Sequence, residues 1–333
     1  MRWIALTIVV VLAAGCSHKE PSRPGEQRSG LFLIEKGGRY GYMDRSGEIK
    51  IPPQFDQAAA FSDGLAAVAI ASRAGYIDEQ GKFAINPQFD SASPFSEGMA
   101  AVRVGKEWGF IDRTGKLVIP AQYQNPGAVP LQFSQGLVAV NHGPGTPVGY
   151  VDKHGRTVIS PQFDYALPFS DDRALVGKGG RYGFIDTAGK IIVNPQYDEA
   201  SSFYEDRAAV RIGNRWGYID PSGKIVTNPQ FDAARMFSDG LAMVAVAGRI
   251  GFIDKTGKFA INPQYDAAND FADGRAPVRV GARWGFIDKT GKLVISPQFD
   301  DARPFSLNLA PVQVGSAWGY VNRDGKFIWN PTA

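Results

Sequence analysis

The stretch "RWGFIDKTGKLVISPQFDDARPF", residues 283–305, contains the phrase that decides the fold. Its Trp-Gly-Phe core recurs along the chain, with an aromatic residue after the glycine in every copy. The recurring glycines are Gly41, Gly75, Gly109, Gly149, Gly183, Gly217, Gly251, Gly285 and Gly319. Successive glycines are 34 residues apart, except for one spacing of 40. Nine copies at a fixed period indicate a repeat protein whose units stack on their neighbours.

Each copy is typical of short antiparallel strands joined by tight turns. In the last copy, Ala310, Val312 and Val314 alternate with period two and so share one face of a strand. The phrase "WGFID" predicts a second strand and "KLVI" a third, and "PQFDDARPF" predicts a fourth, more irregular one. We therefore expect an all-β repeat array of strands and hairpins.

The phrase Asp288-Lys289-Thr290-Gly291 has the letters of the phosphorylated aspartate motif of an ion pump. The equivalent phrases in the other copies keep Asp or Asn first and Gly fourth, while the middle pair varies freely. A phosphorylated aspartate would require a fixed Lys and Thr. The pattern instead predicts a hairpin turn in which the Asp side chain accepts backbone N–H bonds and Gly takes a positive φ.

The repeated phrase [W/Y]-G-[F/Y]-[I/V]-D-x-x-G-K, followed by "PQF" and "F-x-[D/E]-G-L-A-x-V", resembles the WG-repeat family of bacterial proteins. The resemblance covers residues 31–331. Three copies depart from it at the Trp position, where they carry Ala74, Val148 and Ile250. The resemblance implies a β-strand array used for binding or scaffolding. It implies no particular ligand and no catalytic residue.

The ends of the array bear on whether it is open or closed. The chain enters the repeats at Leu31 and leaves them just after Trp329, so one "PQFDxAxxF" segment is missing and neither end supplies it. Nine units also exceed the usual four to eight blades of a propeller. These features favour an open β solenoid or superhelix, with a closed β-propeller-like ring as the alternative.

The N-terminal residues have the pattern of a lipoprotein signal. Residues 1–15 combine Arg2 with an apolar run too short to span a membrane, and they end before Cys16 in Ala13-Ala14-Gly15. We expect a signal peptide over 1–15, lipidation of Cys16, a flexible tether over 16–30 and the repeat array over 31–333. An ordinary secretory signal is the alternative. The expected location is the cell envelope, with an outer membrane favoured by Ser17 in a Gram-negative host.

Composition argues against several kinds of chemistry. A net charge of +3 is too balanced to indicate nucleic-acid binding. Cys16 is the only cysteine, and the three histidines lack the spacing of a metal site. The repeated turn aspartates are each followed by a turn glycine and, in eight copies, a basic residue, which opposes a calcium ladder. We expect no metal, no cofactor and no catalytic residue.

The tryptophans before the repeat glycines, Trp108, Trp216, Trp284 and Trp318, could form a stripe that stacks on sugars. Core packing is the favoured interpretation, with each glycine making room for the indole of a neighbouring strand.

Two function classes remain. The first is a non-catalytic binding or scaffold lipoprotein of the cell envelope, whose partner is a protein or a glycan such as peptidoglycan or another polysaccharide. Membrane contact would occur only through the lipid. The second is an envelope hydrolase with dispersed carboxylates. It requires paired Asp or Glu residues that depart from the repeat pattern, and the sequence contains no such cluster.

The single 40-residue spacing, between Gly109 and Gly149, marks the candidate binding site. Four extra residues lie between Tyr123 and Phe133, and two more lie between Gly136 and Gly149. Insertions in repeat arrays form loops on one face, which is often the binding face. The candidate ligand-binding residues in or beside these insertions are Gln124, Asn125, Asn141 and His142. The alternative is a surface loop that tolerates six extra residues without function.

Overall fold

The computed structural model describes residues 29–124 and 131–331. The predicted signal peptide, Cys16 and Asn125 therefore lie outside the described residues. Strands account for the regular structure of these residues, which contain no helix. Accordingly, no helix in this part of the chain has the length and apolarity needed to span a membrane.

The strands form nine antiparallel sheets. The first five sheets contain β1 (Phe32–Lys36), β2 (Arg39–Met43), β3 (Ile49–Phe55); β4 (Gln57–Ala58), β5 (Ala66–Ile70), β6 (Arg73–Ile77), β7 (Phe83–Phe89); β8 (Ser91–Ala92), β9 (Met99–Val104), β10 (Glu107–Asp112), β11 (Leu117–Tyr123); β12 (Leu137–Val140), β13 (Val148–Asp152), β14 (Thr157–Phe163); and β15 (Tyr165–Ala166), β16 (Ala174–Lys178), β17 (Arg181–Ile185), β18 (Ile191–Tyr197).

The other four sheets each have four strands. They contain β19 (Glu199–Ala200), β20 (Ala208–Ile212), β21 (Arg215–Ile219), β22 (Ile225–Phe231); β23 (Ala233–Ser238), β24 (Leu241–Val246), β25 (Arg249–Ile253), β26 (Phe259–Tyr265); β27 (Ala267–Ala268), β28 (Arg275–Val280), β29 (Arg283–Asp288), β30 (Leu293–Phe299); and β31 (Asp301–Ala302), β32 (Ala310–Val314), β33 (Ala317–Val321), β34 (Phe327–Trp329).

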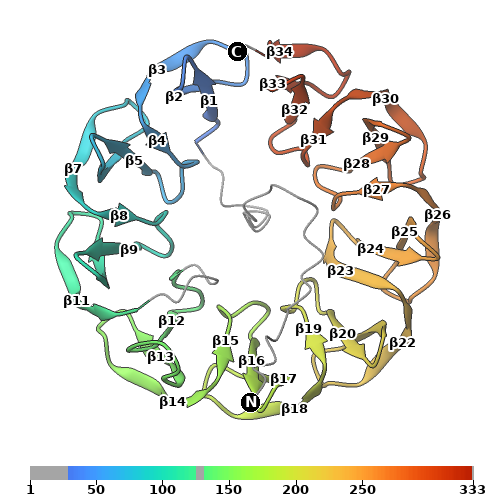
Figure 1. The fold of residues 1–333 in the computed structure, drawn as a ribbon, viewed down its shortest axis with the longest axis horizontal. Coiled ribbons are helices and arrows are strands. Elements are labelled where there is room, and N and C mark those ends of the chain that lie inside the picture. Colours follow the sequence, from blue (N-terminus) through green and yellow to red (C-terminus); the bar gives the residue numbers. More distant parts are fainter. Residues whose placement is uncertain (1–28, 125–130, 332–333) are drawn as a thin grey trace, which may run out of the picture.

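The nine sheets, here called blades 1 to 9 in chain order, are arranged as a closed ring (Figure 1). Blade 9 packs directly on blade 1 through Phe32, Ile34, Met43 and Leu309, which are buried together. The all-β repeat array is confirmed, and the closed ring is its form, so the preference for an open solenoid was wrong. The missing segment does not prevent closure, because apolar side chains of blades 9 and 1 pack on each other directly.

The hydrophobic core lies between neighbouring blades rather than within single ones. The cluster between blades 6 and 7, for example, joins Tyr218 and Phe231 to Phe237 and Val244. At eight junctions the aromatic residue after the repeat glycine meets a phenylalanine of the next blade. The ring centroids of these pairs are 4.7–5.1 Å apart. Because each blade buries its neighbour's apolar side chains, no blade has a complete core alone.

The last two strands of each unit differ from the sequence prediction. The third strand of blade 8, β30, runs from Leu293 through "PQF" to Phe299, and only Asp301–Ala302 form the next strand. Pro297 lacks a backbone N–H, which a central strand would need for its neighbour. It is tolerated because β30 pairs on one side only, at the outer edge of its sheet (Figure 1).

The repeat glycine makes room for backbone rather than for an indole. A Cβ atom at Gly285 would lie 2.5 Å from the carbonyl oxygen of Ile295 and 2.7 Å from the nitrogen of Pro297. The equivalent glycines in the other blades meet the same backbone atoms of their own outer strand. The expected reason for this glycine was therefore wrong. Only glycine lets the outer strand cross so close to the second strand.

The Asp-x-x-Gly phrases form the hairpin turns that the sequence predicts. Asp288 Oδ1 accepts the backbone N–H groups of Thr290 and Lys292 at 2.9 and 3.1 Å. Gly291 has φ +85°. In the last unit Asn322 Oδ1 accepts the two equivalent N–H bonds.

Candidate functional site

A repeated clasp joins most neighbouring blades, and its loss marks the candidate site. Asp90, which follows "PQF", lies between blades 2 and 3. One of its carboxylate oxygens is 2.6 Å from Arg73 Nη1, and the other accepts the Gly105 N–H at 2.7 Å. The same pairing of aspartate with the arginine of the preceding blade joins Arg39–Asp56, Arg181–Asp198, Arg215–Asp232, Arg249–Asp266 and Arg283–Asp300.

Blade 4 lacks this ion pair on both of its sides. Between blades 3 and 4, Gln124 takes the aspartate position and Glu107 takes the arginine position. Between blades 4 and 5, Pro147 takes the arginine position. Asp164 therefore keeps only the backbone half of the clasp, in which it accepts the Gly179 N–H at 2.7 Å. The inserted loops thus belong to a blade that lacks the clasp ion pair on both sides, while Lys153 of this blade still pairs with Glu97 of blade 3 at 3.3 Å.

The structure brings three of the four predicted site residues together. The Gln124 N–H donates to the Asn141 carbonyl oxygen at 3.0 Å, so the two residues lie on adjacent segments. Asn141 Nδ2 donates to the Gly143 carbonyl at 3.4 Å, and the side chain is buried. Its Oδ1 atom is buried without a hydrogen-bond partner among the described residues. An unpaired buried acceptor is costly, so a hydrogen-bond donor at this amide oxygen would stabilise the site.

His142 is exposed at the edge of this group. Its ring lies beside that of Tyr123, with centroids 5.2 Å apart and planes tilted by 44°. His142 Nδ1 lies 3.3 Å from the Gln122 carbonyl oxygen, which leaves Nε2 directed elsewhere. Tyr123 is buried, and burial raises the pKa of its hydroxyl. The buried Tyr123 ring of blade 3 thus supports the exposed His142 ring of blade 4.

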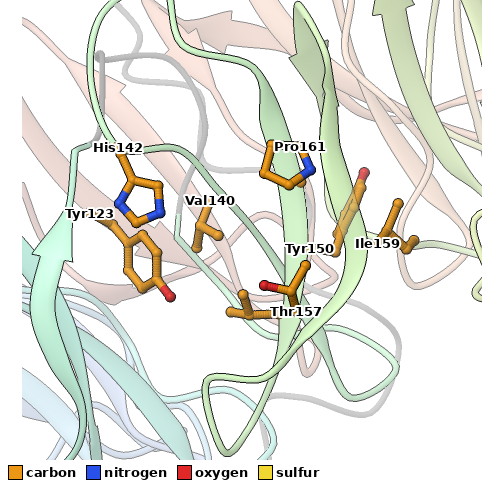
Figure 2. Close-up of a pocket in the computed structure, with 9 residues that line it drawn as sticks. Tyr123, Val140, His142, Tyr150, Thr157, Ile159 and Pro161 are labelled. Atoms are coloured by element: carbon orange, nitrogen blue, oxygen red, sulfur yellow. The ribbon is translucent and has the colours of Figure 1, made fainter.

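A small cavity of about 30 Å³ lies beside these residues (Figure 2). Tyr123 and His142 line one side of it, and Tyr150, Thr157 and Pro161 line the other. A volume of this size accommodates about one water molecule. The site can therefore accept a single polar group or a side chain at its rim, but it cannot enclose a cofactor.

Sequence reasoning missed a second set of polar contacts, around the inner rim of the ring. The turns "SDGL" and their equivalents point toward the centre in Figure 1. Asp63 Oδ2 accepts the N–H of Gly98 in the next blade at 2.9 Å, and Asp239 Oδ2 accepts that of Gly274 at 2.6 Å. These acidic side chains bind neighbouring backbone. The signal in the sequence is the Asp or Glu before glycine in the phrase F-x-[D/E]-G.

One carboxyl group departs from the repeat pattern. Asp270 occupies a position that holds no acidic residue in the other units, and its side chain is 12% exposed. Burial raises the pKa of Asp270, and the nearby Arg235, with Nε at 3.8 Å, opposes that shift. The described residues contain no group of three His, Cys, Asp or Glu side chains that could hold a metal.

These features define a repeat β-propeller of nine interlocked blades, in which blade 4 carries the inserted loops. The chain belongs to the WG-repeat family. The family model for the WG containing repeat matches residues 40–70, 75–108, 108–143, 149–182, 182–216, 216–249, 250–283 and 284–316. The model matches eight stretches, and the ninth repeat glycine, Gly319, lies beyond them. No curated protein matches the chain.

The chain matches solved structures at low sequence identity. A structure described as that of the eukaryotic initiation factor is 14% identical, with a TM-score of 0.65 over 90% of this chain and 94% of that one. Dihydro-heme d1 dehydrogenase NirN is 16% identical, with a TM-score of 0.49 over 84% and 76% of the two chains. Virginiamycin B lyase from Staphylococcus aureus is 18% identical, with a TM-score of 0.37 over 71% and 92%. At 14% identity, the likeness to the first of these structures concerns the fold alone.

Proposed function

We propose that this protein is a non-catalytic binding or scaffold protein of the bacterial cell envelope, anchored to a membrane by lipid on Cys16. The site on blade 4 carries the binding part of the proposal. There the clasp ion pairs are absent, the Asn141 Oδ1 atom is buried without a hydrogen-bond partner in the described part of the chain, and His142 is exposed. The neighbouring blades would form a rigid scaffold that holds these groups in place. The loops of blade 4 differ from those of the other blades, and binding residues are often found on such loops.

The chemistry of the site supports recognition rather than catalysis. Gln124 and Asn141 offer amide donors and acceptors, and His142 adds an aromatic surface with one titratable nitrogen. Such groups suit the hydroxyl and amide groups of an envelope glycan, including peptidoglycan, or the backbone of a protein partner. A hydrolase of this kind needs two carboxyl groups close together. The contacts described above for Asp270 include an arginine and no second carboxyl group, so they do not support the hydrolase alternative.

The binding site is tested by two single variants of blade 4. His142→Ala should weaken binding to a partner isolated from envelope extract or to a glycan selected on an array. His154→Ala is the matched control, because His154 is an exposed histidine on a turn of the same blade. Equal affinity of both variants and of the unmodified chain would place the binding surface elsewhere.

The anchor is tested separately. The sequence Ala13-Ala14-Gly15-Cys16 supports lipidation, and an outer membrane is the proposed destination in a Gram-negative host. Cys16→Ser should move the protein from the membrane fraction to the soluble fraction and remove the lipid mass. Unchanged fractionation together with unchanged mass would contradict the anchor while leaving the binding site untouched.

A further inference from the structure

Blade 1 differs from most of the ring at its inner edge. In blades 2, 3 and 5 to 9, a short strand pairs with the inner side of the sheet, as β31 does with β32. The sheet of blade 1 has the order β1-β2-β3 and ends at β1. Blade 4, the other three-stranded blade, keeps a bridge between Gln124 and Asn141 at this position. Among the described residues, β1 is therefore the strand whose inner edge has no such neighbour.

The seven inner strands show what this position normally holds. In blade 9 the Asp300 and Arg303 N–H groups each donate to the sheet at 2.9 Å, to the carbonyls of Gln313 and Pro311. Ala302 between them is fully buried. Phe305, three residues later, packs against Phe286 of the preceding blade with centroids 4.9 Å apart. The shared pattern is Asp-x-Ala-x-x-Phe, read from the N-terminal end of the segment.

The groups that would receive such a strand are present at the junction of blades 9 and 1. In the antiparallel register of β1 with β2, Lys36 faces Arg39 across the turn, so Leu33 and Glu35 direct their backbone groups away from β2. The Tyr320 hydroxyl donates to the Leu33 carbonyl at 2.8 Å. Elsewhere the equivalent tyrosine bonds the inner strand itself, as the Tyr42 hydroxyl does at the Ala59 carbonyl.

Tyr320 also lacks the aromatic partner that its equivalents have. Tyr42, Tyr76, Tyr150 and Tyr218 are fully buried, each beside a phenylalanine of the next inner segment. Tyr320 is partly exposed, and its ring meets Phe32 at a longer centroid distance of 5.7 Å. Among the described residues, the junction thus combines a strand edge that has no inner strand with a partly exposed aromatic ring.

We propose that the inner edge of β1 binds an extended segment of a partner protein with the pattern Asp-x-Ala-x-x-Phe. The segment adds antiparallel to β1 and donates backbone N–H groups to the Glu35 and Leu33 carbonyls. At Leu33 it replaces the Tyr320 hydroxyl, which then bonds the segment as the Tyr42 hydroxyl bonds Ala59. Its alanine faces the buried side, and its phenylalanine packs on Tyr320. Strand addition of this kind gains affinity from backbone bonds and specificity from alternate side chains.

The residues of this chain that precede β1 fit the position poorly. Counting back one period from Ala58 and Phe61 places Pro24 at the alanine position and Gln27 at the phenylalanine position. Neither side chain matches the pattern, so a partner segment is the better occupant. The β1 edge is far from blade 4 in sequence. A partner segment could bind there whether or not blade 4 binds a ligand.

A synthetic peptide with the sequence of residues 300–308, DDARPFSLN, is the probe. It should bind the chain that begins at residue 17 and slow amide exchange of residues 32–36. A control peptide with serine in place of the phenylalanine should bind roughly tenfold more weakly, since an aromatic contact is lost. Equal binding of the two peptides, no binding, or protection elsewhere on the ring would overturn the proposal.

Two further measurements distinguish a partner segment from the two other possible occupants of the β1 edge, the chain's own residues 17–28 and a second copy of the chain. The chain that begins at residue 29 keeps every described residue and should bind the peptide with unchanged affinity. Binding only after this truncation would show that the chain's own residues 17–28 occupy the edge. Sedimentation of the chain alone should show a monomer. A dimer that the peptide dissociates would assign the edge to a second copy, and it would likewise overturn a partner segment.

Discussion

The Tyr320 hydroxyl donates a 2.8 Å hydrogen bond to the carbonyl oxygen of Leu33, a residue 287 positions earlier in the chain. The equivalent tyrosines elsewhere bond a carbonyl only 17 positions later, in the next blade. At the junction of blades 9 and 1 the tyrosine therefore bonds β1 itself instead of an inner segment, and this contact joins the last blade to the first.

We expect Tyr320→Phe to lower the free energy of unfolding by about 1 kcal/mol, because a partly buried carbonyl loses its donor. Tyr218→Phe is the matched control, since it removes the equivalent bond inside the ring at Arg235. Chemical denaturation of both variants measures the effect. If Tyr218→Phe clearly lowers the free energy of unfolding and Tyr320→Phe does not, the contact between blades 9 and 1 would be contradicted.

The repeat glycine gives a second prediction. Gly285→Ala should destabilise the ring by at least ~1–3 kcal/mol, because its Cβ atom would lie 2.5 Å from the Ile295 carbonyl oxygen and the backbone must move. Gly143→Ala is the control, since its nearest neighbour would be the Gln124 side chain at 3.9 Å. Thermal unfolding compares the two, and equal midpoints would exclude the proposed close approach.

A third prediction concerns acid. Bonds from the Thr290 hydroxyl, the Thr290 and Lys292 N–H groups and the Lys292 charge hold the pKa of Asp288 below its usual 3.8, and that of Asp44 falls to about 2. A lowered folded-state pKa gives stability that is present above the unfolded value and lost as pH falls through the folded one. The ring should therefore lose stability between about pH 4 and pH 2.

The chain itself supplies the control for this effect. Asn322 makes the same turn without a titratable group, so Asp288→Asn should keep the turn and reduce the acid dependence. The reverse change, Asn322→Asp, should increase it. Denaturant midpoints measured across the pH range report both. An unchanged pH profile in both variants would show that these turns do not contribute to acid unfolding.

The missing clasp between blades 3 and 4 can be restored. Glu107→Arg together with Gln124→Asp recreates the pair that Arg73 and Asp90 form between blades 2 and 3. An exposed pair of this kind adds at most ~1 kcal/mol, and each single change should add nothing. A double-mutant cycle isolates the coupling. A coupling energy of zero would show that blade 4 does not align its neighbours as the other blades do.

Local structure could be predicted from the sequence because each unit repeats its own pattern. The turn at Asp288 and Gly291 followed from columns in which the first and fourth residues stay fixed. Closure could not be predicted, because it depends on the angle between blades, and no single residue encodes that angle. The junction between blades 9 and 1 is formed in part by Tyr320, Leu309 and Phe32. In the sequence these residues match their equivalents in the other repeats, so they do not indicate closure.

The candidate site was predictable only in part. The break in period identified Gln124, Asn141 and His142, and the structure places these residues together. The unpaired Asn141 oxygen depends on how the inserted loop folds, which the sequence does not reveal. The missing clasps can be predicted from the sequence alone. The arginine and aspartate positions recur in most repeats, and both positions hold other residues at the junction of blades 3 and 4.

The distance between blades 1 and 9 tests the closed ring most directly. Spin labels on cysteines at Lys36 and Val314, with Cys16 replaced by serine, occupy equivalent exposed positions in these blades. A second pair at Val280 and Val314 marks two blades that are neighbours in the chain. Pulsed electron spin resonance should give the same distance for both pairs. An open array, with eight sheet spacings of ~10 Å, would instead separate the first pair by roughly 80 Å.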